Sequence, residues 1–257
     1  MRALKLQFAW IFVLAIVTAV AAQTPAPAPS LDQIVSQMEA ARTEQRPAPF
    51  LLTREYRMFH GEEAKPTSEV KAQINVVPQQ ARDYKIVETH GSTRGEGVVR
   101  KILDYEAKSE KKNPPPSAVT RDNYDFEYLG EEQFQNARCY VLKLKPKRKD
   151  PSLVDGKAWV DAETFYLWKI QGEMAKSPSW WVKEVNLTVL YGEMGGIWMQ
   201  TLTQANAKVR ILGQYKISGQ ATDVKTSSAV ASNRMPRKSQ RRVPAPAGVL
   251  PGVLAAR

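Results

Sequence analysis

The sequence contains one cysteine, Cys139, and two histidines, His60 and His90, among 257 residues. One cysteine cannot form an internal disulfide, and one cysteine with two scattered histidines gives no metal-ligand spacing. No Gly-x-Ser-x-Gly elbow and no phosphate-cradling glycine loop is present. Each histidine follows a strand pattern and directly precedes a glycine, which favours a turn residue. We therefore expect no catalytic residue, no metal and no cofactor.

Acidic side chains offer one alternative to this expectation. Asp155, Asp161 and Glu163 cluster around one predicted hairpin. A pair of carboxylates could do acid–base chemistry. Asp and Glu at such positions are more typical of turns, and we expect that role here. Cys139 lies in the strand pattern 137–144, which predicts a buried structural thiol.

Long apolar runs are also missing, with one exception at the N-terminus. Arg2 and Lys5 precede an uncharged apolar run, Phe8–Val20, which is shorter than the roughly 20 residues of a spanning helix. Ala19-Val20-Ala21 matches a small-residue cleavage site, so residues 1–22 are predicted to be a cleaved signal peptide. A retained anchor is the alternative. The residues immediately after the cleavage site, Ala22 and Gln23, are not cysteine, so we expect export to the periplasm as a soluble protein without a lipid anchor.

Positive charge is concentrated at the two ends of the chain. The net charge is +11, but residues 226–257 hold six of the Lys and Arg residues and no acidic residue. The folded part is only mildly basic, so nucleic acid is not an expected partner. The tail is poor in large apolar residues and is predicted to be disordered. An anionic membrane surface could attract it; a functionless extension is the alternative.

Between these ends, hydrophobic periodicity predicts two helices and about ten strands. Residues 23–29 form a Pro/Ala spacer, and 30–225 form one domain. A capping-box pattern at Ser30 opens a helix to about Arg42, and a second helix is centred on 98–106. The rest alternates with period two, broken by an exposed Asn113–Ser117 loop. The predicted strands are 52–59, 68–77, 82–89, 124–129, 139–144, 157–160, 165–173, 180–191, 197–207 and 209–217.

This pattern predicts a mainly β fold of the α+β type. Short successive strands with tight turns favour one large curved antiparallel sheet, or an incomplete β-barrel, covered by the two helices. Some strands are apolar on both faces: Trp180 and Trp181 are adjacent and would point to opposite faces of a regular strand. Either ordinary core packing covers the second face, or the sheet curls around an apolar cavity.

The second half of the sequence resembles a known family. The residues that carry the resemblance are Gly156-Lys-Ala-Trp-Val-Asp161, the following Ala162–Ile170, Gly172–Pro178, Trp180–Asn186 and Tyr191–Trp198. This series is similar to the outer-membrane lipoprotein-sorting, LolA-like superfamily. The resemblance spans roughly residues 30–224 and is strongest over 124–198. It implies an incomplete antiparallel β-barrel with an apolar concave side and helical lids.

The resemblance also implies a function. It suggests a periplasmic carrier or chaperone that binds a lipoprotein acyl chain, or another apolar ligand, with partner proteins in the inner and outer membranes. An RseB-type envelope sensor and a structural interaction module are the alternatives. The expected cavity-lining residues come from the central strands, and a one-residue register slip would invert their faces. These residues are Trp159, Phe165, Leu167, Trp181, Val185, Leu187 and Trp198.

Overall fold

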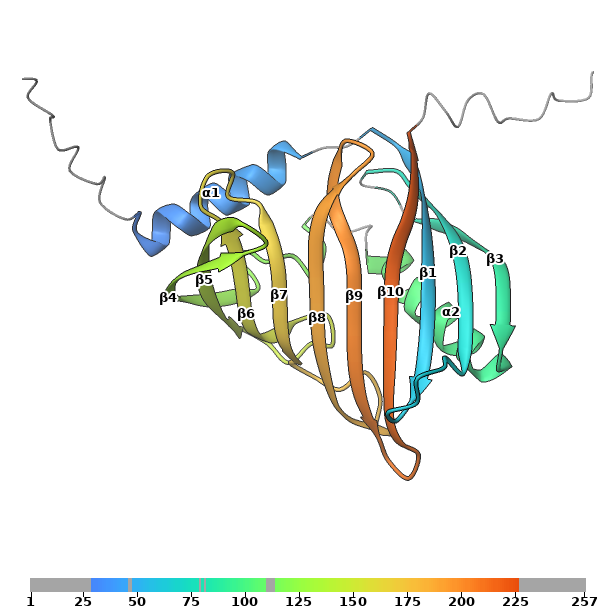
Figure 1. Ribbon diagram of the computed structural model, residues 1–257. Coiled ribbons are helices and arrows are strands. Elements are labelled where there is room, and N and C mark those ends of the chain that lie inside the picture. Colours follow the sequence, from blue (N-terminus) through green and yellow to red (C-terminus); the bar gives the residue numbers. More distant parts are fainter. Residues whose placement is uncertain (1–28, 46–47, 79, 81, 110–113, 227–257) are drawn as a thin grey trace, which may run out of the picture.

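The computed structural model describes residues 29–45, 48–78, 80, 82–109 and 114–226 (Figure 1). The predicted signal peptide, the spacer up to residue 28 and the basic tail after Thr226 lie outside these residues. Within the described part of the chain, none of the helices has the length and apolar character needed to cross a membrane.

All ten strands belong to one antiparallel sheet with the order β3-β2-β1-β10-β9-β8-β7-β6-β5-β4. The sheet is not closed, because β3 and β4 are its two edges. The predicted fold class, a mainly β protein with one large antiparallel sheet and two helices, is confirmed. The strands are β1 (Phe50–His60), β2 (Ser68–Val76), β3 (Asp83–Gly91), β4 (Tyr124–Phe134), β5 (Ala137–Pro146), β6 (Val154–Asp161), β7 (Leu167–Met174), β8 (Val182–Met194), β9 (Ile197–Val209) and β10 (Gly213–Thr226).

Three strands begin two or more residues later than predicted. The strand expected from Val209 begins at Gly213, because Val209 still belongs to β9. The strand expected from Trp180 begins at Val182, and the strand expected from Phe165 begins at Leu167. Phe165 has a positive φ of 57°, in the left-handed region outside the extended conformation of a regular strand. The side chain of Asp161 accepts hydrogen bonds from the backbone N–H groups of Glu163 and Thr164, so the turn between β6 and β7 extends past the point where the apolar run begins.

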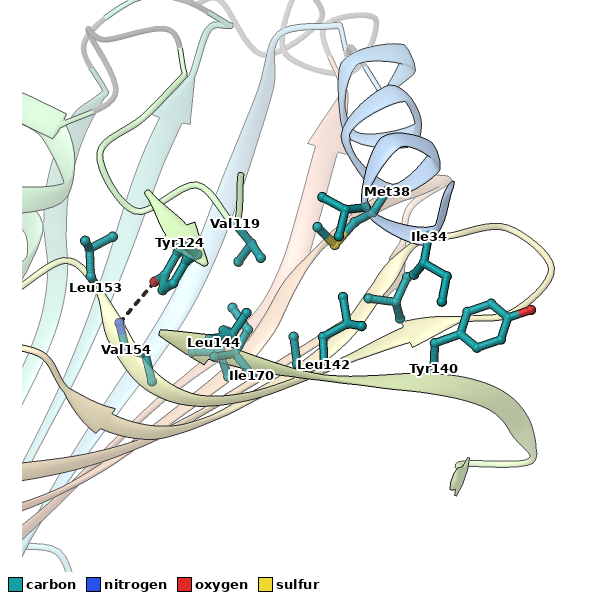
Figure 2. Packing of buried hydrophobic residues seen from close by; sticks show 14 of the residues in the cluster. Ile34, Met38, Val119, Tyr124, Tyr140, Leu142, Leu144, Leu153, Val154 and Ile170 are labelled. Carbon is teal, nitrogen blue, oxygen red and sulfur yellow. Dashed lines mark hydrogen bonds between the residues drawn. The ribbon is translucent and has the colours of Figure 1, made fainter. Parts of the chain in front are cut away.

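Helix α1 (Leu31–Glu44) covers the half of the sheet that contains β4 to β8. It begins with the predicted capping box, in which Ser30 and Gln33 exchange side-chain and backbone hydrogen bonds. Its buried residues, which include Ile34 and Met38, belong to the first hydrophobic core with Leu142, Leu144 and Ile170 among others (Figure 2). Burying one large aliphatic side chain contributes about 1.5–3 kcal/mol, so this stripe holds the helix on the sheet.

Helix α2 (Thr93–Ser109) covers the other half, against β2 and β3. Val99 and Leu103 are buried in a second core with residues of β1, β2 and β10. Near its C-terminus, Glu106 lies 3.4 Å from the buried guanidinium of Arg54 on β1. Arg82 lies 3.7 Å from the same carboxylate, so an apolar stripe and two ion pairs of Glu106 fix this helix.

Both helices pack on the same face of the sheet. Val189, in the first core, is paired with Thr203; Thr203 is paired with Gly219; and Gly219 is paired with Tyr56, in the second core. Residues directly opposite each other on neighbouring strands share a face. We call this the helix-covered face. The two cores thus lie on one surface, and β8, β9 and β10 run between them.

Candidate ligand-binding pocket

A pocket of about 330 Å³ opens on the helix-covered face beside the C-terminal half of α1. Its volume is at the lower end of the range of about 300–1,000 Å³ for small-molecule sites. Five separate parts of the chain build it: α1, the segment 115–119, the β6–β7 turn, β8 and the start of β9. The lining residues are Met38, Arg42, Gln45, Pro115, Ser117, Ala118, Val119, Phe165, Tyr166, Leu167, Tyr191, Trp198 and Met199.

The walls are mostly aromatic and aliphatic. The indole Nε1 of Trp198 donates a hydrogen bond of 3.1 Å to the carbonyl of Leu167, so this polar group of the wall is already satisfied. Burial raises the pKa of the Tyr191 phenol well above its ordinary value, and the nearby Tyr124 adds to the shift. A phenol in such surroundings stays neutral at physiological pH. The interior therefore suits an uncharged, mainly apolar group.

Arg42 gives the pocket its one positive charge. It lies in the last turn of α1 and is exposed. Among the residues that the structure describes, no carboxylate lies within ion-pair distance of it. A cation beside an apolar pocket favours a ligand that carries an anionic group next to an apolar chain.

A single arginine fastens α1 over this region. The Arg121 guanidinium donates to the Glu39 carboxylate at 2.7 Å, to the Asp32 carboxylate at 2.7 Å and to the Ser36 hydroxyl at 3.0 Å. The backbone N–H of Arg121 donates to the other oxygen of Glu39 at 2.7 Å. Arg121 lies two residues after the segment 115–119, so its hydrogen bonds join the helix to that wall of the pocket.

Three of the seven residues predicted to line a cavity, Phe165, Leu167 and Trp198, line this pocket. Leu187 packs against the first core but is not part of the pocket wall. Val185 is buried on β8 and shares a face with Leu187, because the two are two residues apart. Of these five, Phe165 lies in the β6–β7 turn, and the others lie on β7, β8 and the start of β9.

Trp159 lies elsewhere, on the outer face of the sheet. Its neighbours Ala158 and Val160 point into the first core, so alternation turns Trp159 the other way. There it packs with Cys139 and Val141. Its indole Nε1 donates to Glu132 at 2.8 Å, and the Lys169 ammonium lies 4.2 Å from its ring centroid. The prediction that Trp159 lines the cavity assigned this residue to the wrong face of β6.

Trp181 is also outside the pocket. It lies in the turn before β8, and its ring stacks on that of Trp180 with centroids 4.0 Å apart and an interplanar angle of 20°. Both rings are exposed, at 71% for Trp180 and 53% for Trp181. The expectation of opposite faces assumed a regular strand, and these residues are not in one.

Four residues that line the pocket were not predicted from the sequence: Met38, Val119, Tyr191 and Met199. Met38 lies in the first predicted helix, and no sequence pattern linked any of the four residues to a pocket. They come from segments far apart in the sequence, and only the tertiary fold brings them together. Periodicity within one element cannot identify such neighbours.

None of the residues considered for catalysis lines the pocket. The His60 ring is placed 3.1 Å from the carbonyl of Leu212, and His90 lies 2.8 Å from Glu88. Asp161 serves the β6–β7 turn as described above, and Asp155 pairs with Lys143 at 2.9 Å. Within the described ranges, no group of three or more His, Cys, Asp or Glu side chains could hold a metal ion.

Comparison with known proteins gives a limited set of matches. A family model described only as an uncharacterized protein matches residues 117–236. A search of the curated proteins finds no match. Among solved structures, the chain is similar to one described as an outer-membrane lipoprotein-sorting protein domain from Vibrio parahaemolyticus, with 10% identity, a TM-score of 0.46, and coverage of 76% of this chain and 92% of the other.

Two further structures are similar at the same level. A LolA superfamily protein from Nitrosomonas europaea has 13% identity, a TM-score of 0.43, and coverage of 77% of this chain and 94% of the other. A DUF1329 family protein from Desulfovibrio piger has 11% identity, a TM-score of 0.40, and coverage of 76% and 92%. These matches include the LolA superfamily, which the sequence resembles. Matches with identities below 25% and TM-scores below 0.5 do not show what this chain binds.

Proposed function

We propose that the protein is a non-enzymatic binding protein of the periplasm, a carrier or chaperone that takes an acyl chain of a lipoprotein or lipid into the pocket beside α1. The observation that carries this proposal is the wall itself, which is built mainly from apolar side chains and has a satisfied indole N–H. Each methylene moved from water into such surroundings contributes about 0.8 kcal/mol. A carrier needs no reactive group, and the pocket offers none.

The polar residues of the pocket suit this type of ligand. Arg42 is placed to bind the anionic group of an amphiphile, whose chain then lies against Leu167 and Tyr191. The expected signal peptide, if cleaved, would deliver the protein to a compartment where such molecules cross between membranes. The basic tail would add electrostatic attraction to anionic membrane surfaces.

Filling the pocket tests the proposal. Ala118 lines it and is only half-buried, so Ala118→Trp places an indole in the ligand volume. Gln204→Trp is the matched control, because Gln204 is exposed on the outer face of β9. We expect cis-parinaric acid to bind the wild type and the control with 1:1 stoichiometry, and to bind Ala118→Trp at least tenfold more weakly. Saturable binding of equal strength to all three proteins would place the ligand elsewhere.

The alternatives predict different results. A structural interaction module predicts no saturable binding of the fatty acid to the folded wild type. An envelope sensor predicts binding that changes the affinity for a membrane-anchored protein partner. Native mass spectrometry of protein purified from the periplasm separates these cases, because a carrier should retain a bound lipid or lipopeptide during purification.

A further inference from the structure

A second surface, far from the pocket, combines exposed apolar side chains with unpaired cations. Most large hydrophobic side chains of the described residues are covered, and seven are exposed. Four of the seven come from two adjacent loops: Trp180 and Trp181 before β8, and Ile211 and Leu212 between β9 and β10. The backbone N–H of Arg210 donates to the carbonyl of Trp181 at 2.7 Å, which joins the two loops. We call these four residues the apolar tip.

The apolar tip projects from the sheet. Figure 1 shows the β9–β10 hairpin extending past the neighbouring strands at the lower end of the molecule. Ile211, at its turn, is fully exposed. The four exposed side chains of the tip, two on this hairpin and two on the loop before β8, are not core residues of this chain.

Ile211 also adopts a strained backbone conformation. Its φ is +69°, in the left-handed region where a β-branched residue is a genuine outlier. Tight hairpin turns of this kind normally use Gly, Asn or Asp at such a position. An isoleucine here stabilises neither the turn nor a core, and strain of this type is concentrated at functional sites.

The charges around the apolar tip are positive on balance. In the loop beside Leu212, Glu62 pairs with Lys216 at 2.6 Å and Glu63 lies 3.4 Å from His60. Lys183 and Arg210 are exposed, and neither has an ion-pair partner among the described residues. The nearest acidic side chain on β8, Glu184, is neutralised by Lys208 at 2.9 Å. The tip therefore presents apolar groups with a positive rim.

We propose that the apolar tip docks the protein on an anionic lipid bilayer. Tryptophan is enriched at the membrane–water interface, where its ring lies among the head groups, and cations beside it attract anionic lipids. A stable protein–protein interface needs about 800 Å² from each partner, and a narrow projecting hairpin offers little flat surface of that kind. A convex apolar point with a cationic rim fits the soft, anionic surface of a bilayer.

Ile211→Asn tests this docking without disturbing the fold. Asn tolerates the left-handed conformation, so the variant should unfold at the same temperature as the wild type or a higher one. Leu129→Asn is the matched control, because Leu129 is an exposed aliphatic residue on the edge strand β4, outside the apolar tip. The full-length protein is mixed with phosphatidylethanolamine/phosphatidylglycerol vesicles and sedimented.

We expect the partition coefficient of Ile211→Asn to fall about tenfold, the loss for one buried large aliphatic side chain, and that of Leu129→Asn to stay at the wild-type value. Wild-type Trp emission should shift to shorter wavelength on the vesicles. Equal sedimentation of both variants would overturn the proposal. So would a loss of self-association in Ile211→Asn by analytical ultracentrifugation without any change in vesicle binding, since the tip would then bind a second copy. The affinity for cis-parinaric acid, measured on the same variant, should not change, which separates this proposal from that of the pocket.

Discussion

Arg42→Gln should weaken binding of an anionic amphiphile but not of its uncharged ester. The substitution removes the charge and keeps most of the aliphatic stem, so the wall of the pocket is largely preserved. Arg42 has no ion-pair partner among the described residues, and a bound carboxylate would be its first. The variant therefore isolates one charge interaction at the pocket.

The expected loss of affinity depends on how far the Arg42 guanidinium is exposed to water. Two unit charges 4 Å apart interact by about 1 kcal/mol in bulk water and about 4 kcal/mol near a protein surface of lower effective dielectric. Exposed ion pairs in proteins contribute about 0–1 kcal/mol. Because Arg42 is exposed, we take the lower value, about 1 kcal/mol, which corresponds to a roughly fivefold increase in Kd.

The assay compares palmitic acid with methyl palmitate as competitors of a fluorescent probe. For Arg42→Gln we expect the acid to lose about fivefold in affinity and the ester to lose none, while Arg42→Lys keeps the wild-type preference. High salt should reduce the difference, because the group is exposed to screening. Arg42 also lies in the last turn of α1, where a cation favours the helix dipole, so thermal unfolding must be measured alongside. An equal loss for acid and ester would refute the role of the charge.

Three further predictions concern the scaffold. Arg121→Ala should lower the free energy of unfolding by about 1–2 kcal/mol, after discounting its partial exposure, and hydrogen exchange should quicken in α1 but not in α2. Cys139 is buried, and burial raises its pKa to about 11, so iodoacetamide at pH 8 should modify it only after denaturation; fast labelling of the native protein would contradict this. Gly172→Ala should destabilise the protein by about 1–3 kcal/mol, because a Cβ there would lie 2.2 Å from the carbonyl oxygen of Asp155. The control Gly97→Ala meets no atom within 4 Å and should be neutral or stabilising; equal effects of the two would refute the steric argument.

Local patterns predicted the secondary structure well, for identifiable reasons. Ser30 and Gln33 form a capping box that depends only on residues close in sequence, so the start of α1 was visible in the sequence. Period-two alternation and turn residues identified ten strands, and the structure has the same ten in one antiparallel sheet. Antiparallel hairpins pair neighbours along the chain, which makes such a fold readable from sequence.

The pocket was less predictable. Ala158, Trp159 and Val160 are all apolar, so hydrophobicity does not show which of them faces the core. Ala158 and Val160 do, and Trp159 therefore lies on the other face, contrary to the prediction. A positive φ at Phe165 and the turn at Trp181 cannot be read from hydrophobicity. Met38 and Met199 meet only through the tertiary fold.

The positions of the pocket and of the apolar tip lead to one more prediction. Trp198 stands at the start of β9 and the tip follows its end. At about 3.3 Å per residue, the strand's 13 residues separate them by roughly 40 Å, more than the thickness of a bilayer's hydrocarbon core of about 30 Å. A molecule docked by its tip therefore holds the pocket away from that bilayer.

Brominated lipids, which quench indole fluorescence only at short range, measure this separation. In vesicles of brominated phosphatidylglycerol we expect the wild type to lose part of its emission. In the protein without the predicted signal peptide, which contains Trp10, the double variant Trp180→Phe/Trp181→Phe should lose none of its remaining emission. Its other tryptophans, Trp159, Trp168 and Trp198, all lie toward the other end of the sheet. Quenching that persists in the double variant, and disappears with Trp198→Phe, would mean that the pocket end faces the membrane, and the docking geometry would have to be reversed.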